Sequence, residues 1–128
     1  MGKNKYIICV GDEFTIEWYY KPNGKSPARD YFESLPEERQ NKLVKLLVVM
    51  ARVGEVQNVE KFRNEGDKIY AFKPHPDRFL CFFFIGSKII VTNGFEKKSQ
   101  KLPPEEKDRA LRHQSDYIVR VNKGIYYE

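Results

Sequence analysis

Phe79-Leu80-Cys81-Phe82-Phe83-Phe84 is the stretch that determines the fold, because it is apolar at every position and follows a single charged residue, Arg78. A strand without polar alternation is typical of the centre of a sheet that is covered on both faces. Pro74-His75-Pro76-Asp77 predicts a turn before this strand, and Gly86-Ser87 predicts a hairpin turn after it. The pattern therefore predicts an antiparallel meander made of residues 69–73, 78–84 and 88–95.

Further strands are expected upstream of this meander. Residues 6–10 and 14–20 are short β-prone runs separated by Gly11-Asp12, which indicates a hairpin near the N-terminus. Residues 59–63 are candidates for an additional edge strand. The meander therefore has three or four strands, with the N-terminal β segment preceding it.

Two helices are predicted between the N-terminal segment and the meander. Ser26-Pro27 suits an N-cap followed by the first helical position, so residues 28–35 form the first helix. Pro36 restarts the chain, and Gly54 is placed as a C-terminal cap for the second. The second helix has apolar residues at helical spacing: Leu43, Leu46, Leu47, Met50 and Val53.

A last helix begins after Pro103-Pro104, where Glu105 and Glu106 favour a helix N-terminus. The element order is then an N-terminal β segment, a helical hairpin, a three- to four-stranded antiparallel curved sheet and a C-terminal helix. This is an α+β fold, and the absence of repeats or linkers predicts a single domain over residues 1–128. The final tyrosines, in Ile125-Tyr126-Tyr127, are candidates for an edge strand or a partner contact.

The composition narrows the possible functions without choosing one. Twenty-three Lys and Arg against eighteen Asp and Glu give a formal charge of +5, which favours polyanionic partners. Cys9 and Cys81 lie in apolar runs and do not combine with His75 and His113 in a zinc-site spacing, so we expect no metal and no cofactor. The apolar stretch near the N-terminus, residues 6–10, is shorter than the ~7–15 residues of a signal peptide's core, and the longest apolar run, residues 79–85, is far shorter than the ~18 of a membrane span. We expect a cytoplasmic protein that does not enter the membrane.

Three segments between Gly24 and Tyr117 resemble the RelE/ParE superfamily of toxins, most closely its HigB-like, phage-associated branch. The first is residues 24–35, GKSPARDYFESL, at the start of the helical hairpin. The second is the pair of strands IYAFK at 69–73 and RFLCFF at 78–83. The third and most specific is NGFEKKSQKLP at 93–103, which is similar to the family's Gly-Phe-x-Lys-Lys signature. The chain departs from the family pattern at Ala71 and Lys73, where the family usually has Glu and Arg.

The resemblance implies an RelE-like fold and the toxin of a type II toxin–antitoxin system. Such a toxin is a ribosome-dependent endoribonuclease, an mRNA interferase whose hydrolase chemistry needs no metal. The 2′-hydroxyl of the messenger RNA attacks the adjacent phosphate. The implied partners are the ribosome, the mRNA and a cognate antitoxin, expected to be a helix-turn-helix protein.

Four candidate catalytic residues follow from this resemblance. Arg78 aligns with the family's strand arginine and would stabilise charge on the phosphate. Lys73 lies across the turn from it, and His75 in that turn has a side chain that exchanges protons near neutral pH. We expect Lys97 or Lys98 to reach the cleavage site, and Lys98 and Lys101 to bind RNA. The nuclease hypothesis requires that the turn and the lysine cluster share one accessible pocket.

Each of these residues also has a purely structural interpretation. Lys73 and Arg78 could be solvated charges at a hairpin end, His75 a plain turn residue, and the lysines a solvated loop. The same fold also hosts ParE-like toxins that bind DNA gyrase without chemistry of their own. An inactive prophage-derived member is a third alternative, because Lys73 replaces a bidentate guanidinium with a point charge.

Overall fold

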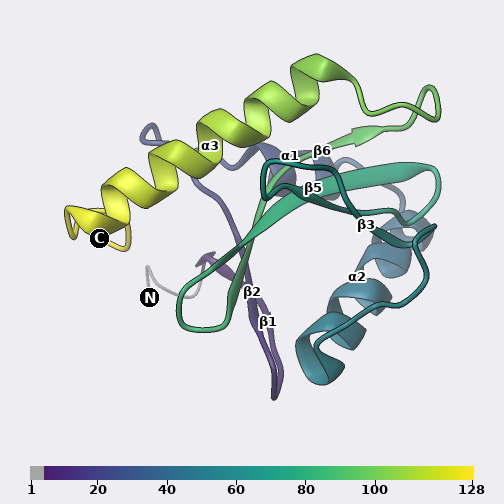
Figure 1. The fold of residues 1–128 in the computed structure, drawn as a ribbon, viewed down its shortest axis with the longest axis horizontal. Helices are drawn as coiled ribbons and strands as arrows, with labels where there is room; N and C mark the ends of the chain where they lie inside the picture. The colour runs from purple at the N-terminus through teal and green to yellow at the C-terminus, as the bar shows by residue number, and fades with distance from the viewer. Residues whose placement is uncertain (1–4) are drawn as a thin grey trace.

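β5 (Asp77–Phe84) and β6 (Lys88–Glu96) form the centre of a six-stranded sheet in the computed structural model, which describes residues 5–128. The strand order is β1-β2-β6-β5-β4-β3 (Figure 1). The outer strands are β1 (Ile7–Val10), β2 (Thr15–Trp18), β3 (Phe62–Asn64) and β4 (Tyr70–Phe72). The first four residues of the predicted 1–128 domain lie outside the described residues.

The sheet is larger and more mixed than the predicted three to four antiparallel strands. The N-terminal hairpin does form, but β2 then pairs in parallel with β6, from Thr15 opposite Lys88 to Trp18 opposite Val91. The predicted edge strand also forms, as β3 paired antiparallel with β4. Together these pairings give six strands, because β2 and β1 are added at the β6 edge of the meander and β3 at the β4 edge.

The helices begin and end close to the predicted residues. In α1 (Pro27–Glu33) the Ser26 side chain accepts a hydrogen bond from the Arg29 amide. α2 (Glu37–Val53) ends at Gly54, which has a left-handed φ of 89°. α3 (Pro104–Asn122) begins after Pro103. The cap chemistry read from Ser26, Pro27 and Gly54 is therefore confirmed.

The two faces of the central strands are covered by different helices. Phe79 packs its ring against Tyr31 of α1, whereas Phe82 and Phe84 pack edge-on against Tyr117 of α3. Phe79, Leu80, Cys81 and Phe82 are at most 1% exposed, which confirms that β5 is central. α3 crosses the sheet in Figure 1, and α2 lies on the side of the N-terminal hairpin.

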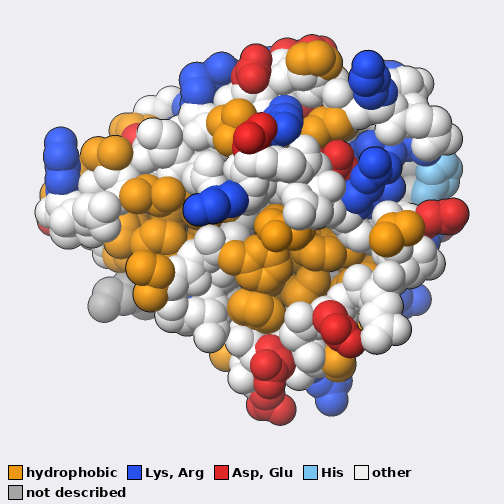
Figure 2. Space-filling view, viewed as in Figure 1, with side chains coloured by type: hydrophobic (Ala, Val, Ile, Leu, Met, Phe, Trp, Pro, Cys, Tyr) orange, Lys and Arg blue, Asp and Glu red, His pale blue; other side chains and the backbone are white. Residues whose placement is uncertain are grey.

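Two predicted core positions are exposed instead. Phe83 is 38% exposed, and its ring lies edge-on to the rings of Phe14, Phe62 and Tyr70. Val53 is 64% exposed at the end of α2. Figure 2 shows hydrophobic side chains gathered at the centre of one face of the molecule.

The C-terminal tyrosines do not form the edge strand considered above. Tyr126 is buried, its hydroxyl accepts a hydrogen bond from the Tyr20 amide at 2.8 Å, and its carbonyl accepts one from the Tyr6 hydroxyl. Tyr127 donates to the buried carboxylate of Glu17 at 2.6 Å. The segment after α3 therefore binds to the N-terminal hairpin through side chains. None of the helices in residues 5–128 is both long and apolar enough to cross a membrane.

Candidate active site

A cleft of about 440 Å³ opens beside the ends of β3, β4, β5 and β6, and we call it the basic cleft. Its volume lies within the ~300–1,000 Å³ range of pockets that hold small ligands. The residues that line it come from five segments of the chain: Val59, Glu60, Lys61, Arg63, Lys73, His75, Arg78, Lys97 and Gln100. Five are Lys or Arg and one is Glu, so the cleft has a surplus of positive charge that favours an anion.

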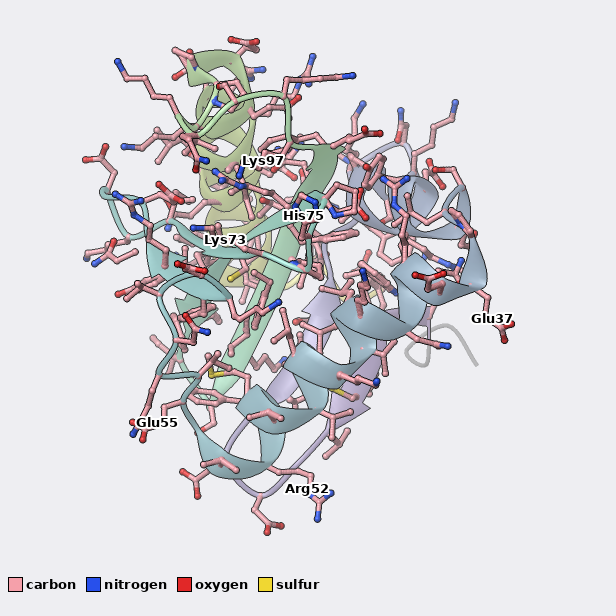
Figure 3. All side chains as sticks on the ribbon, turned by 90° about the vertical axis from the view of Figure 1, so that its right-hand side faces the viewer. Glu37, Arg52, Glu55, Lys73, His75 and Lys97 are labelled. Atoms are coloured by element: carbon pink, nitrogen blue, oxygen red, sulfur yellow. The ribbon has the colours of Figure 1, made fainter. Side chains whose placement is uncertain are left out.

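The structure brings the four predicted catalytic residues together in this cleft. Lys73 follows β4, His75 lies in the turn, Arg78 is the second residue of β5 and Lys97 directly follows β6. The turn and the end of β6 are joined by a hydrogen bond from the Lys97 amide to the Pro76 carbonyl at 2.8 Å. Figure 3 shows Lys73, His75 and Lys97 close together, with Arg52 at the other end of the view.

Arg78 is the most deeply placed cation of the cleft. It is 3% exposed, and its Nη1 donates to the Gln100 carbonyl at 3.5 Å. Within residues 5–128 no carboxylate lies within ion-pair distance of its guanidinium. A buried cation without a carboxylate partner is costly to the fold unless an anion supplies the missing charge. Arg78 is therefore free to bind an anion that enters the cleft.

The pKa of Lys73 is lower than that of an ordinary surface lysine. Burial lowers its pKa from the usual 10.5, and the neighbouring Arg78 and Arg63 cations lower it further. Its ammonium donates to the Val59 carbonyl at 3.3 Å. A lysine with a lowered pKa spends more time as a neutral amine, the form that accepts a proton.

The other two predicted catalytic residues, His75 and Lys97, differ in accessibility. His75 is exposed at the rim of the cleft, where an entering molecule meets it first. Lys97 is half-buried. Figure 2 shows Lys and Arg side chains gathered next to a histidine along the right-hand edge of the molecule. The arrangement offers a buried guanidinium inside, amines on the walls and an imidazole at the entrance.

The turn that contains His75 is held in place by Asp77, the first residue of β5. Its side chain is fully buried and accepts hydrogen bonds from the Tyr31 hydroxyl and from Arg39, whose Nε lies 3.0 Å from Oδ2. Burial and this carboxylate together raise the pKa of Tyr31 above its usual 10.0, so the phenol stays protonated and keeps donating. α1 and α2 thus hold the first residue of β5, next to Arg78.

Some residues that line the basic cleft were not predicted from the sequence, and two predicted RNA-binding residues lie outside the cleft. Lys61, Arg63 and Gln100 also line the cleft, the first two because β3 runs alongside β4. The signal in the sequence for Lys61 and Arg63 was the weak edge-strand pattern of residues 59–63, which does not include Gln100. Lys98 and Lys101 are exposed in the loop after β6 and do not line the cleft. Within residues 5–128, no group of three His, Cys, Asp or Glu side chains is arranged to hold a metal ion.

The sequence of this chain matches the model of a known protein family. Residues 30–115 match the family described as Phage derived protein Gp49-like (DUF891). The chain belongs to this Gp49-like family. The match covers more than half of the 128 residues and includes α2, the whole meander and most of α3. The Gp49-like family is part of the RelE-like toxin–antitoxin group, and its members are often toxins with an antitoxin partner. No curated protein matches the chain.

Proposed function

We propose that this Gp49-like protein is the toxin of a type II toxin–antitoxin pair, of the HigB-like branch, and a ribosome-dependent endoribonuclease. The observation that carries the proposal is the convergence of Lys73, His75, Arg78 and Lys97 on one cleft. A phosphodiester is the RNA group that such a concentration of cations binds best. The ribosome would hold the messenger RNA in the bent geometry that the attack requires.

The cleavage needs a base, an acid and a cation at the phosphate. Lys73, as a neutral amine, removes the proton from the 2′-hydroxyl, and the 2′-oxygen attacks the adjacent phosphorus. Arg78 donates to the non-bridging oxygens, where negative charge grows in the transition state. Lys97 adds a second cation beside them.

The bond from phosphorus to the 5′-oxygen then breaks. Protonated His75, at the rim of the cleft, gives its proton to this leaving oxygen. The products are a 2′,3′-cyclic phosphate and a 5′-hydroxyl end. The two catalytic groups afterwards exchange protons with solvent, so the reaction consumes no water and needs no redox partner.

The antitoxin, a helix-turn-helix protein in this proposal, would inhibit the toxin by covering the basic cleft. An acidic surface would complement the five Lys and Arg side chains that line it. Such a surface also supplies the carboxylate that Arg78 lacks.

The test is induced expression of the wild type and of Arg78→Ala in growing cells, with transcript ends mapped on translated messages. Wild-type expression should stop growth and produce new 5′-hydroxyl ends, and Arg78→Ala should reduce their formation by about 10²–10³-fold. Arg52→Ala, at the end of α2 away from the cleft, is the matched control and should cleave like the wild type. Growth arrest with intact messages and relaxed DNA would contradict cleavage and indicate a gyrase inhibitor.

A further inference from the structure

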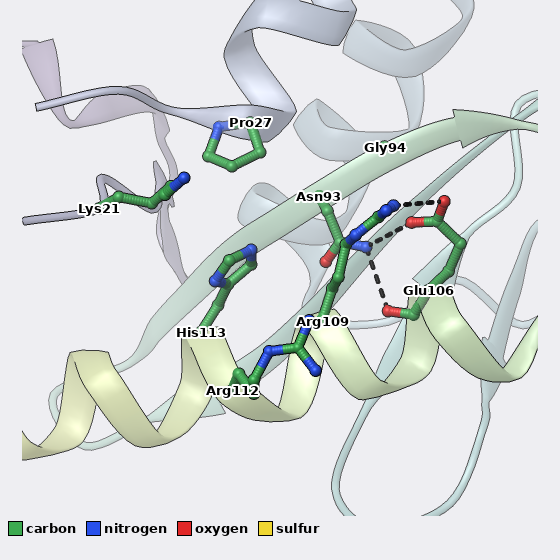
Figure 4. Close-up of a pocket in the computed structure, with 8 residues that line it drawn as sticks. All are labelled: Lys21, Pro27, Asn93, Gly94, Glu106, Arg109, Arg112 and His113. Carbon is green, nitrogen blue, oxygen red and sulfur yellow. Dashed lines mark hydrogen bonds and ion pairs between the residues drawn. The ribbon is translucent and has the colours of Figure 1, made fainter. Parts of the chain in front are cut away.

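A second cleft of about 440 Å³ lies between α3 and the segment that leads into α1 (Figure 4). We call it the α3 cleft. It shares no residue with the basic cleft. Its lining includes three cations, Lys21, Arg109 and Arg112, together with His113, Asn93 and Glu106.

The charges of the α3 cleft are only partly balanced. Glu106 is its single carboxylate, and both of its oxygens are already engaged: Oε1 accepts from Asn93 at 3.0 Å and Oε2 from Arg109 at 2.9 Å. Arg112 and Lys21 form no ion pair within residues 5–128. Two uncompensated cations therefore face one hollow, which favours an anion there.

His113 lies within this field of positive charge. Its ring stacks on Tyr19 with centroids 4.7 Å apart. Burial, followed by the Lys21 and Arg112 charges, lowers the pKa of His113 to about 4. The imidazole is therefore neutral near pH 7 and offers a hydrogen-bond donor without adding to the repulsion between the cations.

We infer that the α3 cleft is a second phosphate site, which binds the phosphodiester backbone of a single RNA strand away from the place of cleavage. Two separate basic clefts on one small chain suit a polymer that carries a charge at every repeat, because one molecule can occupy both. The choice of RNA rests on the proposed function, whereas the anion site rests on the α3 cleft alone.

The experiment uses a fully 2′-O-methylated RNA oligonucleotide, which cannot be cleaved, and follows its binding to the full chain over a range of salt concentrations. Arg112→Gln should weaken binding and reduce the slope of log affinity against log salt by about 0.7, the value for one lost contact with a single strand. Arg52→Gln, an exposed helical arginine outside the cleft, should keep the wild-type slope. Binding should also shift the His113 ring resonances in the wild type, and at the same RNA concentration the shift should be smaller in Arg112→Gln.

Three results would overturn the inference. They are equal slopes for Arg112→Gln and the wild type, an equal loss in Arg52→Gln, and binding of polyglutamate in place of the RNA. The last result would assign the α3 cleft to an acidic protein segment. If the RNA binds as expected but translated messages remain intact in cells, only the endoribonuclease proposal fails.

Discussion

Arg39 of α2 and the buried Asp77 of β5 form a partly buried ion pair, with Nη2 and Oδ1 2.5 Å apart, which fastens the helical hairpin to the residue before Arg78. The pair joins two segments 38 residues apart in the chain. Positioning of the basic cleft is therefore coupled to the packing of α1 and α2.

Asp77→Ala should destabilise the fold by about 2–3 kcal/mol, because Tyr31 and Arg39 lose their shared acceptor. Urea unfolding measures this change. Glu33→Ala removes the exposed Arg29–Glu33 pair and should cost less than about 0.5 kcal/mol. Equal stability of Asp77→Ala and the wild type would show that the pair does not hold the hairpin.

The pH dependence of cleavage should follow Lys73. Burial and the neighbouring cations lower its pKa, so the rising limb of the pH–rate profile, where the ammonium loses its proton, should lie below pH 10.5. Arg63→Gln removes one of these cations, so the pKa of Lys73 should rise and the profile should move to higher pH. Single-turnover cleavage on programmed ribosomes measures the profile.

Chemical labelling of the Lys73 amine at a series of pH values, measured by mass spectrometry, reports the same change in its pKa without an activity assay. An unmoved labelling curve in Arg63→Gln would remove the electrostatic basis for Lys73 as the base.

Gly94→Ala should destabilise the protein through packing. A Cβ at position 94 would lie 2.7 Å from the Phe79 ring and 2.8 Å from Tyr31, so the core would have to shift at a cost of about 1–3 kcal/mol. Gly86→Ala is the control for backbone strain. Apart from the chain neighbours, no atom lies within 4 Å of a Cβ at position 86, whereas the φ of +85° strains any residue with a side chain. Thermal unfolding compares the two, and Phe79→Leu should partly rescue only the variant at position 94.

His113 should make stability depend on pH between about 4 and 6.5. Its pKa is lowered to about 4 in the folded protein, against 6.5 for an ordinary histidine, so in this window the unfolded chain binds more protons. The free energy of unfolding should therefore fall as the pH falls, by about 2 kcal/mol for this half-buried group. Urea unfolding of His113→Gln should lack this contribution, whereas exposed His75→Gln should retain it.

The local elements could be predicted from the sequence because their signals are local. Ser26 and Gly54 mark helix ends through their own hydrogen bonds and backbone angles, and residues 79–82 are buried as their apolar run indicates. The parallel pairing of β2 with β6 could not be predicted, because strands 73 residues apart carry no periodic signal for each other. The position of Tyr126 could not be predicted for the same reason, because its hydrogen-bond partners Tyr6 and Tyr20 lie near the other end of the chain.

The candidate site was predicted only in part. Lys73, His75, Arg78 and Lys97 lie at the ends of three neighbouring strands, β4, β5 and β6, so the meander itself brings them together. Lys61 and Arg63 reach the cleft only through the edge strand, and the Asp77–Arg39 pair depends on how α2 packs. No spacing in the sequence describes that packing.

The central place of β6 means that a chain truncated before this strand cannot form the complete sheet. In the described part of the chain β6 lies between β2 and β5 and joins them, and Lys97 follows it directly. A nascent chain released before residue 88 lacks half of the sheet's centre and one wall of the basic cleft. If the proposed toxin function holds, nonsense alleles that stop translation before residue 88 should therefore abolish toxicity completely rather than yield partly active fragments.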